Sequence, residues 1–231
     1  MDSVLQQHTR ILSAYRTPLP KDCAITPLDR EFRETLTEWA ESEPLQCSQD
    51  HAGNIYITHA GQDPDLAPIA ISFPIDGANS SNNISSALNV FSQLCNKACA
   101  CSVTLLGWTS VSGNLLGRDL WAQPTQIEQH RPSNPWLEDF SECRRASEFP
   151  LSAIFEIAED SQGPLKLVGS HILIQRAREN PASNARVEYS ISKASSTRAP
   201  EIMVKGNDAE KMAQRLIQDY SEYVAAIFDT F

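Results

Sequence analysis

The sequence predicts an α/β fold with a mostly parallel central sheet flanked by helices. Short apolar segments of strand length alternate along the chain with segments whose apolar residues recur at helical spacing, an order typical of parallel sheets joined by helical crossovers. The clearest strand candidate is the near-continuous apolar run at 101–108, and the clearest helix candidate is 84–98. At 231 residues the chain suffices for one large domain. We expect this domain to span 1–231, with an N-terminal arm at 1–20 and an irregular, proline-containing excursion at about 122–150.

Helix start signals mark the first half of the chain. Thr26 is a suitable N-cap, Pro27 fits the first helical position, and Asp29 completes a capping box. The apolar side of this helix consists of Leu28, Phe32, Leu36 and Trp39. The other elements expected in this half are a short helix at 4–15, strands at 54–58, 68–74 and 101–108, the helix 84–98, and a short helix at 115–121.

Strand candidates fill the second half of the chain until a long final helix. The segment 151–158 is apolar, whereas 165–173 and 187–191 give weaker strand signals. A strand at 201–204 precedes the last helix, which we expect Asn207 to cap. The buried face of that helix is expected to carry Met212, Ala213, Leu216, Ile217, Tyr220, Val224 and Ile227.

Composition and charge argue against two classes of partner. The net charge is −10 and the 19 Lys and Arg residues are scattered, so the chain lacks the basic patch of a nucleic-acid-binding protein. No apolar run is long enough to span a membrane, and the N-terminus lacks the basic region and apolar core of a signal peptide. We therefore expect a cytoplasmic protein that binds neither nucleic acid nor membrane.

The six cysteines are expected to remain thiols in a reducing compartment. The spacing of Cys95, Cys99 and Cys101 invites a metal-site interpretation. However, no second cluster of Cys or His lies nearby in the sequence to complete four ligands, and the three fall where an apolar-faced helix ends and a strand begins. Buried structural thiols are therefore the expectation.

The stretch from Asp50 to Tyr56, which reads DHAGNIY, carries the most specific signal in the chain. It follows the helix that contains Leu28-Asp29-Arg30-Glu31 and precedes the apolar strand at 68–74. This order resembles the N-terminal part of the M20 metallopeptidases, specifically their N-carbamoyl-amino-acid and allantoate amidohydrolase branch. The resemblance covers roughly residues 22–165.

The resemblance implies the catalytic-domain scaffold of that family. Full-length members also insert a lid domain, for which this chain is too short, so we expect the scaffold without the lid. Residues 165–231 then form either the returning end of the catalytic domain, which we prefer, or a remnant of a lid.

The resemblance also implies a two-zinc centre, but its matched positions carry other residue types here. The histidine that ends the family's strand corresponds to Phe73, and the metal-bridging aspartate corresponds to Ser85. The general base corresponds to Val111, the ligand after it to Ser112, and a later histidine ligand to Glu156 or its close neighbourhood. Phenylalanine and the serine hydroxyl are not strong zinc ligands, and valine cannot transfer a proton. We therefore expect no metal and no other cofactor.

Two carboxylates are the catalytic candidates that remain. Glu156 stands between Phe155 and Ile157 on an apolar strand, where an ionised carboxylate is costly to bury unless it is paired. It either faces a polar partner or serves as an acid or base with a raised pKa. Asp76, just beyond a strand end, is the second candidate. The substrate-binding candidates at the old cleft are Phe73, Ser85, Val111, Ser112 and His171.

Three functions remain open from the sequence. The first is a metal-independent enzyme of specialised metabolism, of cyclase, isomerase or condensing type, which binds a small organic substrate in the old cleft. The second is a non-catalytic pseudoenzyme that regulates a protein partner, and the third is a residual hydrolase with relocated groups. A homodimer and a heteromeric partner both remain compatible with the sequence.

Overall fold

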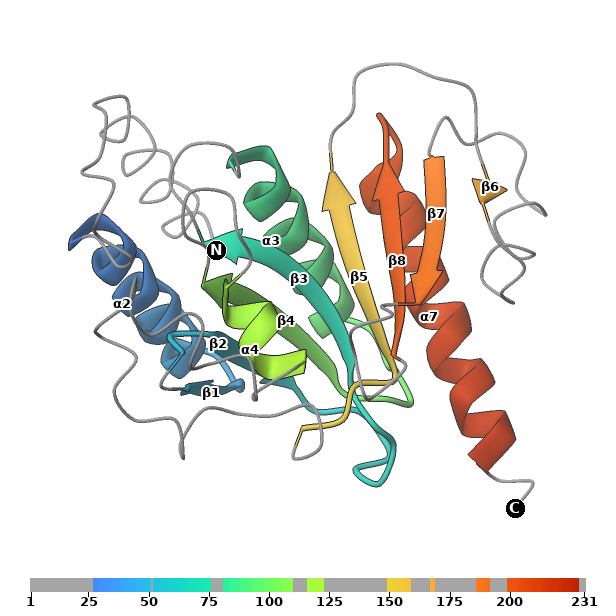
Figure 1. Cartoon of the computed structure of the whole chain (residues 1–231). Helices are drawn as coiled ribbons and strands as arrows, with labels where there is room; N and C mark the ends of the chain where they lie inside the picture. Colours follow the sequence, from blue (N-terminus) through green and yellow to red (C-terminus); the bar gives the residue numbers. More distant parts are fainter. Residues whose placement is uncertain are drawn as a thin grey trace.

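The protein is built around a mixed sheet of eight strands in the order β1-β2-β4-β3-β5-β8-β7-β6 (Figure 1). A computed structural model describes residues 27–50, 52–75, 81–109, 116–122, 149–158, 167–168, 186–191 and 199–228. The strands are β1 (Gln46–Gln49), β2 (Ile55–His59), β3 (Ile69–Ile75), β4 (Val103–Thr109), β5 (Ala153–Ala158), β6 (Leu167–Val168), β7 (Arg186–Ile191) and β8 (Pro200–Lys205). The helices are α2 (Pro27–Ser42), α3 (Ser81–Cys95), α4 (Leu116–Ala122) and α7 (Ala209–Phe228).

The centre of the sheet is parallel, as the sequence predicts. Strands β4, β3, β5 and β8 run in the same direction. Antiparallel pairs are β1 with β2, β2 with β4, and β7 with β8, whereas β6 pairs parallel with β7. The register places Ser72 of β3 opposite Glu156 of β5, and Glu156 opposite Met203 of β8. Because side chains alternate between the faces of a sheet, these three lie on the same face.

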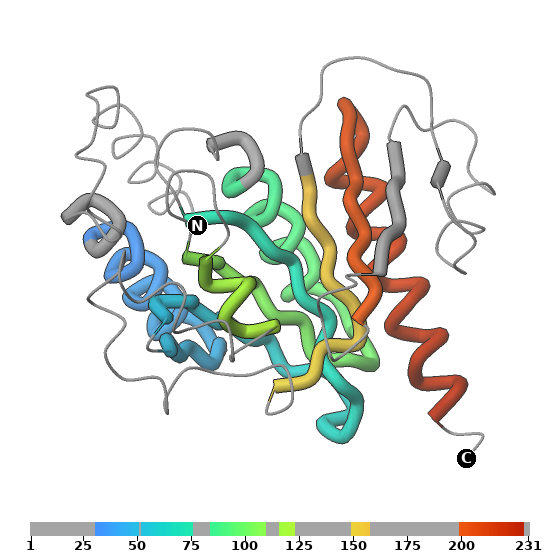
Figure 2. Tube along the Cα trace, in the orientation of Figure 1, coloured from blue at the N-terminus to red at the C-terminus, as the bar shows by residue number. Residues whose placement is uncertain are grey.

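The larger core lies between one face of the sheet and the helices α2, α3 and α7. Figure 1 and Figure 2 show α3 and α7 side by side behind the sheet. Most of the periodic apolar residues predicted for α3 and α7 are buried in this layer, for example Leu88, Phe91 and Leu216. The prediction fails at the end of α7, where Val224 is only partly buried and Ile227 is 40% exposed, because the last turns extend past the sheet (Figure 1). Trp39 of α2 meets Phe91 edge to face at a centroid distance of 6.1 Å, which joins α2 to the same core.

The other face of the sheet carries α4 and a smaller core. Trp108 of β4 and Trp121 of α4 are both 2% exposed, and their rings lie 5.5 Å apart. Both tryptophans are therefore core residues. The indole Nε1 of Trp121 is buried without a hydrogen-bond partner, the one such side-chain atom among the described residues.

The structure shifts several predicted boundaries. Helix α3 begins at Ser81, three residues before the predicted start, and α7 begins at Ala209, so Asp208 rather than Asn207 directly precedes it. The edge strand β1 is not predicted from the sequence. The predicted helix at 4–15 and most of the excursion at 122–150 lie outside the described residues. No helix in the part of the chain that the structure describes has the length and apolar character needed to cross a membrane.

The cysteines that the structure describes are free thiols, as predicted. They are Cys47, Cys95, Cys99 and Cys101, of which the last two are buried. Burial is the main cause that raises the pKa of each of these four thiols, and that of Cys95 reaches about 12. A raised pKa disfavours the thiolate that metal binding and nucleophilic attack require, which fits a structural role.

Candidate functional site

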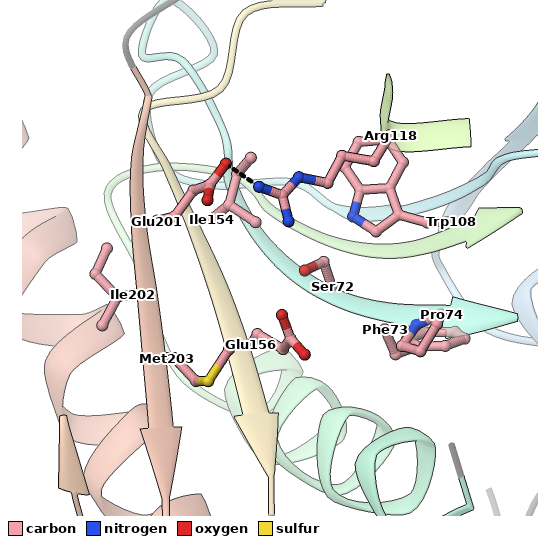
Figure 3. A pocket seen from close by; sticks show the side chains of 10 residues that line it. All are labelled: Ser72, Phe73, Pro74, Trp108, Arg118, Ile154, Glu156, Glu201, Ile202 and Met203. Carbon is pink, nitrogen blue, oxygen red and sulfur yellow. Dashed lines mark hydrogen bonds and ion pairs between the residues drawn. The ribbon is translucent and has the colours of Figure 1, made fainter. Parts of the chain in front are cut away.

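A small cavity lies on the α4 face of the sheet, over the middle of β3, β5 and β8 (Figure 3). Its volume is about 70 Å³. Apolar groups form much of the wall, and two carboxylates, a guanidinium and a hydroxyl interrupt it. The lining residues are Ser72, Phe73, Pro74, Trp108, Arg118, Ile154, Glu156, Glu201, Ile202 and Met203.

Glu156 is positioned in the cavity by the alternation of β5. Phe155 and Ile157 are both 0% exposed in the helix-covered core, so the side chain between them must point to the opposite face. Glu156 is partly buried there, and it makes no hydrogen bond with the residues that the structure describes. This position explains how an ionisable residue can interrupt an apolar strand.

The electrostatic surroundings of Glu156 favour its protonated form. Burial raises the pKa of the carboxyl above its ordinary value of 4.5. The positive charges of Arg118 and Lys205 act in the opposite direction, and the negative charge of Glu201 adds to the rise. Burial is the largest of these effects, so the carboxyl holds its proton to a higher pH than an exposed glutamate does.

Arg118 and Glu201 form an ion pair at the side of this cavity. Nη2 of Arg118 donates to Oε1 of Glu201 at 2.6 Å, and the two side chains are 28% and 19% exposed. The pair joins α4 to β8. Figure 3 shows the guanidinium above Ser72 and Glu156, with its dashed contact to Glu201.

The predicted site residues divide into those that share this cavity and those that do not. Phe73 borders the cavity, but it is 1% exposed and its side chain belongs to the helix-covered core. Ser85 lies on α3, which packs on the opposite face, and it does not line the cavity. Asp76, Val111, Ser112 and His171 lie outside the described residues.

A buried polar network lies at the turn that carries the family resemblance. Asp50 accepts hydrogen bonds from the backbone N–H of Asn54 (2.9 Å), from Nδ2 of Asn54 (3.1 Å) and from the hydroxyl of Tyr56 (3.1 Å). Nε of Arg33 donates to the carbonyl oxygen of Gly53 at 3.0 Å. Asp50 is 5% and Asn54 0% exposed, so the fold depends on these partners to satisfy buried polar groups.

Asn54 connects this turn to two further elements. Its Oδ1 accepts from the backbone N–H of Thr109 at 3.0 Å, and its Nδ2 donates to the carbonyl oxygen of Gly117 at 3.1 Å. Arg33 adds a hydrogen bond from Nη2 to Oγ1 of Thr109 at 3.2 Å. The network therefore fixes the first turn of α4, and with it Arg118, relative to the end of β4.

Sequence reasoning misses Arg118, Glu201 and the network around Asn54. A lone arginine on a short helix and a glutamate at a strand start usually face solvent, and only the strand register brings these two together. Polar residues in a turn that contains glycine are also usually exposed to solvent, so the sequence does not indicate that this turn is buried. The one feature of the sequence that could have indicated the buried network is the number of polar side chains in this turn.

The described residues do not provide the ligands of a zinc centre. Among them, no group of three or more His, Cys, Asp or Glu side chains is placed to hold a metal ion. The position matched to the family's strand histidine is filled by the buried ring of Phe73, and Glu201 is engaged by Arg118. Tetrahedral zinc requires a denser set of strong donors than this cavity offers.

Comparison with known proteins identifies the scaffold. No protein-family model and no curated protein matches the chain. Among solved structures, a hydantoinase/carbamoylase family amidase from Burkholderia vietnamiensis aligns with a TM-score of 0.57 and 17% identity, over 97% of this chain and 73% of the other. The corresponding amidase from Burkholderia multivorans gives 0.56 and 16%, over 97% and 74%.

A protein described as a zinc-dependent exopeptidase, from Bacteroides vulgatus, is similar in fold as well. It aligns with a TM-score of 0.54 and 12% identity, over 94% of both chains. At such low identity these likenesses establish the fold alone. The chain therefore has the α/β scaffold of amidohydrolases and peptidases, which the sequence resemblance predicts.

Proposed function

We propose that this protein binds a small organic molecule on a degenerate amidohydrolase scaffold and acts without a metal, with Glu156 as its acid–base group. The observation that carries this proposal is the partly buried carboxyl of Glu156, which has a raised pKa and faces a cavity. Perturbed carboxyls in cavities are typical of catalytic sites. The altered residues at the matched ligand positions, among them Phe73 and Ser85, support the loss of zinc chemistry.

The chemistry that fits this arrangement is an isomerisation, cyclisation or condensation. In an isomerisation or a cyclisation, one carboxyl can donate a proton to one substrate atom and accept a proton from another. The carboxyl is then back in its starting protonation state. Such general acid–base catalysis contributes typically 10²–10⁴-fold, and it is most effective when the pKa of the group lies near the working pH. The raised pKa of Glu156 moves the group in that direction. We propose a role of this kind in specialised metabolism.

Ligand-observed NMR with a fragment library tests the proposal. We expect fragments that bind the wild-type protein to lose affinity for Glu156→Gln and for the cavity-filling variant Met203→Trp. The matched control is Glu222→Gln, because Glu222 is exposed on α7 and away from the cavity lining. Folding of each variant is checked by circular dichroism. Equal fragment binding by all four proteins would place the ligand site elsewhere.

Binding of a protein partner is a second candidate function, which one observation favours. Tyr223, Ile227 and Phe228 are 42%, 40% and 55% exposed, and they are the large exposed apolar residues among those the structure describes. All three lie in the last two turns of α7. Exposed apolar groups that gather in one place are typical of interaction surfaces. Analytical ultracentrifugation of wild type and Phe228→Ser tests whether this segment joins two copies of the chain. If both proteins sediment as monomers, self-association through this segment is contradicted.

A further inference from the structure

The guanidinium of Arg118 has hydrogen-bonding capacity that the fold does not use. Its contact with Oε1 of Glu201 is its one hydrogen bond to the residues that the structure describes. A guanidinium carries five N–H groups in a planar fork, and that fork matches the geometry of a carboxylate. Glu201 fixes the direction of the group, so the remaining donors are held ready at the cavity.

Two more hydrogen-bonding groups face the same space. The hydroxyl of Ser72 lines the cavity, although the residue is only 5% exposed, and it has no hydrogen bond to the described residues. Glu156 lies opposite Ser72 in the strand register, and its carboxyl likewise has no such partner. Both groups therefore remain available to pair with a ligand that enters the cavity.

The charges around the cavity favour a ligand with one negative charge. Arg118 and Lys205 act on Glu156 as cations, and Glu201 acts as an anion. One positive charge is in excess whenever the Glu156 carboxyl holds its proton, and in that form the carboxyl is a hydrogen-bond donor. A ligand with two negative charges would leave an uncompensated charge beside Glu201.

The volume of the cavity limits the size of the group that enters it. About 70 Å³ accommodates a few water molecules or one small functional group. It is well below the roughly 300 Å³ at which cavities begin to enclose whole drug-sized ligands. The cavity is therefore suited to the head group of a ligand.

We propose that Arg118, Ser72 and Glu156 form a binding site for the carboxylate group of a small organic acid. The guanidinium pairs with the carboxylate oxygens and the hydroxyl of Ser72 donates to the same group. The carboxyl of Glu156 adds a third donor in its protonated form. This inference rests on the proposed function, because it names the ligand class of the same cavity.

Saturation-transfer NMR with acetate and its neutral isostere acetamide tests the ligand class. Both are titrated at matched ionic strength, with inorganic phosphate as a further probe. We expect the wild-type protein to bind acetate more tightly than acetamide or phosphate. Arg118→Gln should weaken acetate binding at least tenfold and leave acetamide unaffected, because charge-assisted hydrogen bonds are about twice as strong as neutral ones.

Two further variants keep the test decisive. Arg118→Lys retains the charge but lacks the planar fork, so it should weaken acetate binding even if Arg118→Gln proves poorly folded. Arg215→Gln removes an arginine of α7 that pairs with Asp219 on the helix surface, and it should bind acetate as the wild type does. Equal affinity of Arg118→Gln and wild type for acetate would overturn the inference.

The outcomes also separate this inference from the proposed function. If acetamide or neutral fragments bind through Glu156 and acetate does not, the carboxylate inference fails and the proposed function stands. If phosphate binds in preference to acetate, the inference fails in the same way. If neither the probes nor the fragments bind, the proposed function fails and the inference fails with it.

Discussion

Replacement of Gly117 by alanine is expected to destabilise the protein, against the usual preference of helices. A Cβ atom at Gly117 would overlap Oδ1 of Asn54 and lie 2.8 Å from both Cγ of Asn54 and the backbone nitrogen of Thr109. Asn54 is 0% exposed and is held by its hydrogen bonds, so it cannot make room without breaking them. The backbone of Thr109 belongs to β4 and cannot shift cheaply either.

The magnitude follows from the contacts of the Asn54 side chain. Its three hydrogen bonds, to Asp50, Thr109 and Gly117, contribute about 1 kcal/mol each, or about 3 kcal/mol together. The higher helix propensity of alanine returns at most about 1 kcal/mol. We therefore expect Gly117→Ala to lower the free energy of unfolding by about 2 kcal/mol.

Urea denaturation of single and double variants measures this effect. In an Asn54→Ala background the clash with the Asn54 side chain is absent and only the contact with the backbone nitrogen of Thr109 remains, so Gly117→Ala should cost less there than in the wild type, and the two changes should not add. Asp119→Ala, exposed on the same helix, serves as the control and should stay within about 0.5 kcal/mol of wild type. Stabilisation by Gly117→Ala, or simple additivity with Asn54→Ala, would show that Asn54 does not obstruct a side chain at position 117.

Three further predictions concern buried groups elsewhere. Because burial raises the pKa of Glu156 above 4.5, its ionised form destabilises the fold at neutral pH. Glu156→Gln should therefore raise the urea midpoint at pH 7, by an amount that shrinks as the pH falls toward 4.5; a gain that does not change with pH contradicts this. Burial and the charge of Glu43 raise the pKa of Cys95 to about 12, so at pH 8.5 iodoacetamide should label it roughly 10²- to 10³-fold more slowly in the folded chain than in urea. Peptide mass spectrometry measures both rates, and similar values would speak against the buried thiol. The backbone N–H of Cys101 donates to Oγ of buried Ser221 at 2.8 Å. Ser221→Ala should lower the free energy of unfolding in urea by about 1–3 kcal/mol, and an unchanged midpoint would show that this donor finds another partner.

The helices and strands with a regular pattern of apolar residues were predictable from the sequence. Helices α2, α3 and α7 carry apolar residues at helical spacing, and strand β4 is apolar throughout, so local pattern and burial agree. Strand β1 (Gln46–Gln49) was not predictable, because QCSQ is polar and its two ends are exposed. It forms a strand because it pairs antiparallel with β2, and this pairing depends on the tertiary fold rather than on the local sequence.

The candidate site was predictable only in part, for a similar reason. Glu156 stood out because a charged residue on an apolar strand needs an explanation. Arg118 and Glu201 are 83 positions apart, and only the arrangement of α4 on β8 brings them within 2.6 Å. The turn from Asp50 to Asn54 indicated the scaffold correctly, but Asp50 and Asn54 prove to be buried, and Asn54 supports α4.

Zinc content is the most direct test, because we propose that this protein acts without the zinc that its resemblance to the M20 metallopeptidases implies. The purified protein is equilibrated with excess zinc, passed over a desalting column and analysed by inductively coupled plasma mass spectrometry. We expect far less than one zinc per chain, and we expect a chelator to leave the fragment affinity unchanged. One or two tightly bound zinc ions per chain would contradict it and would favour a hydrolase with relocated ligands.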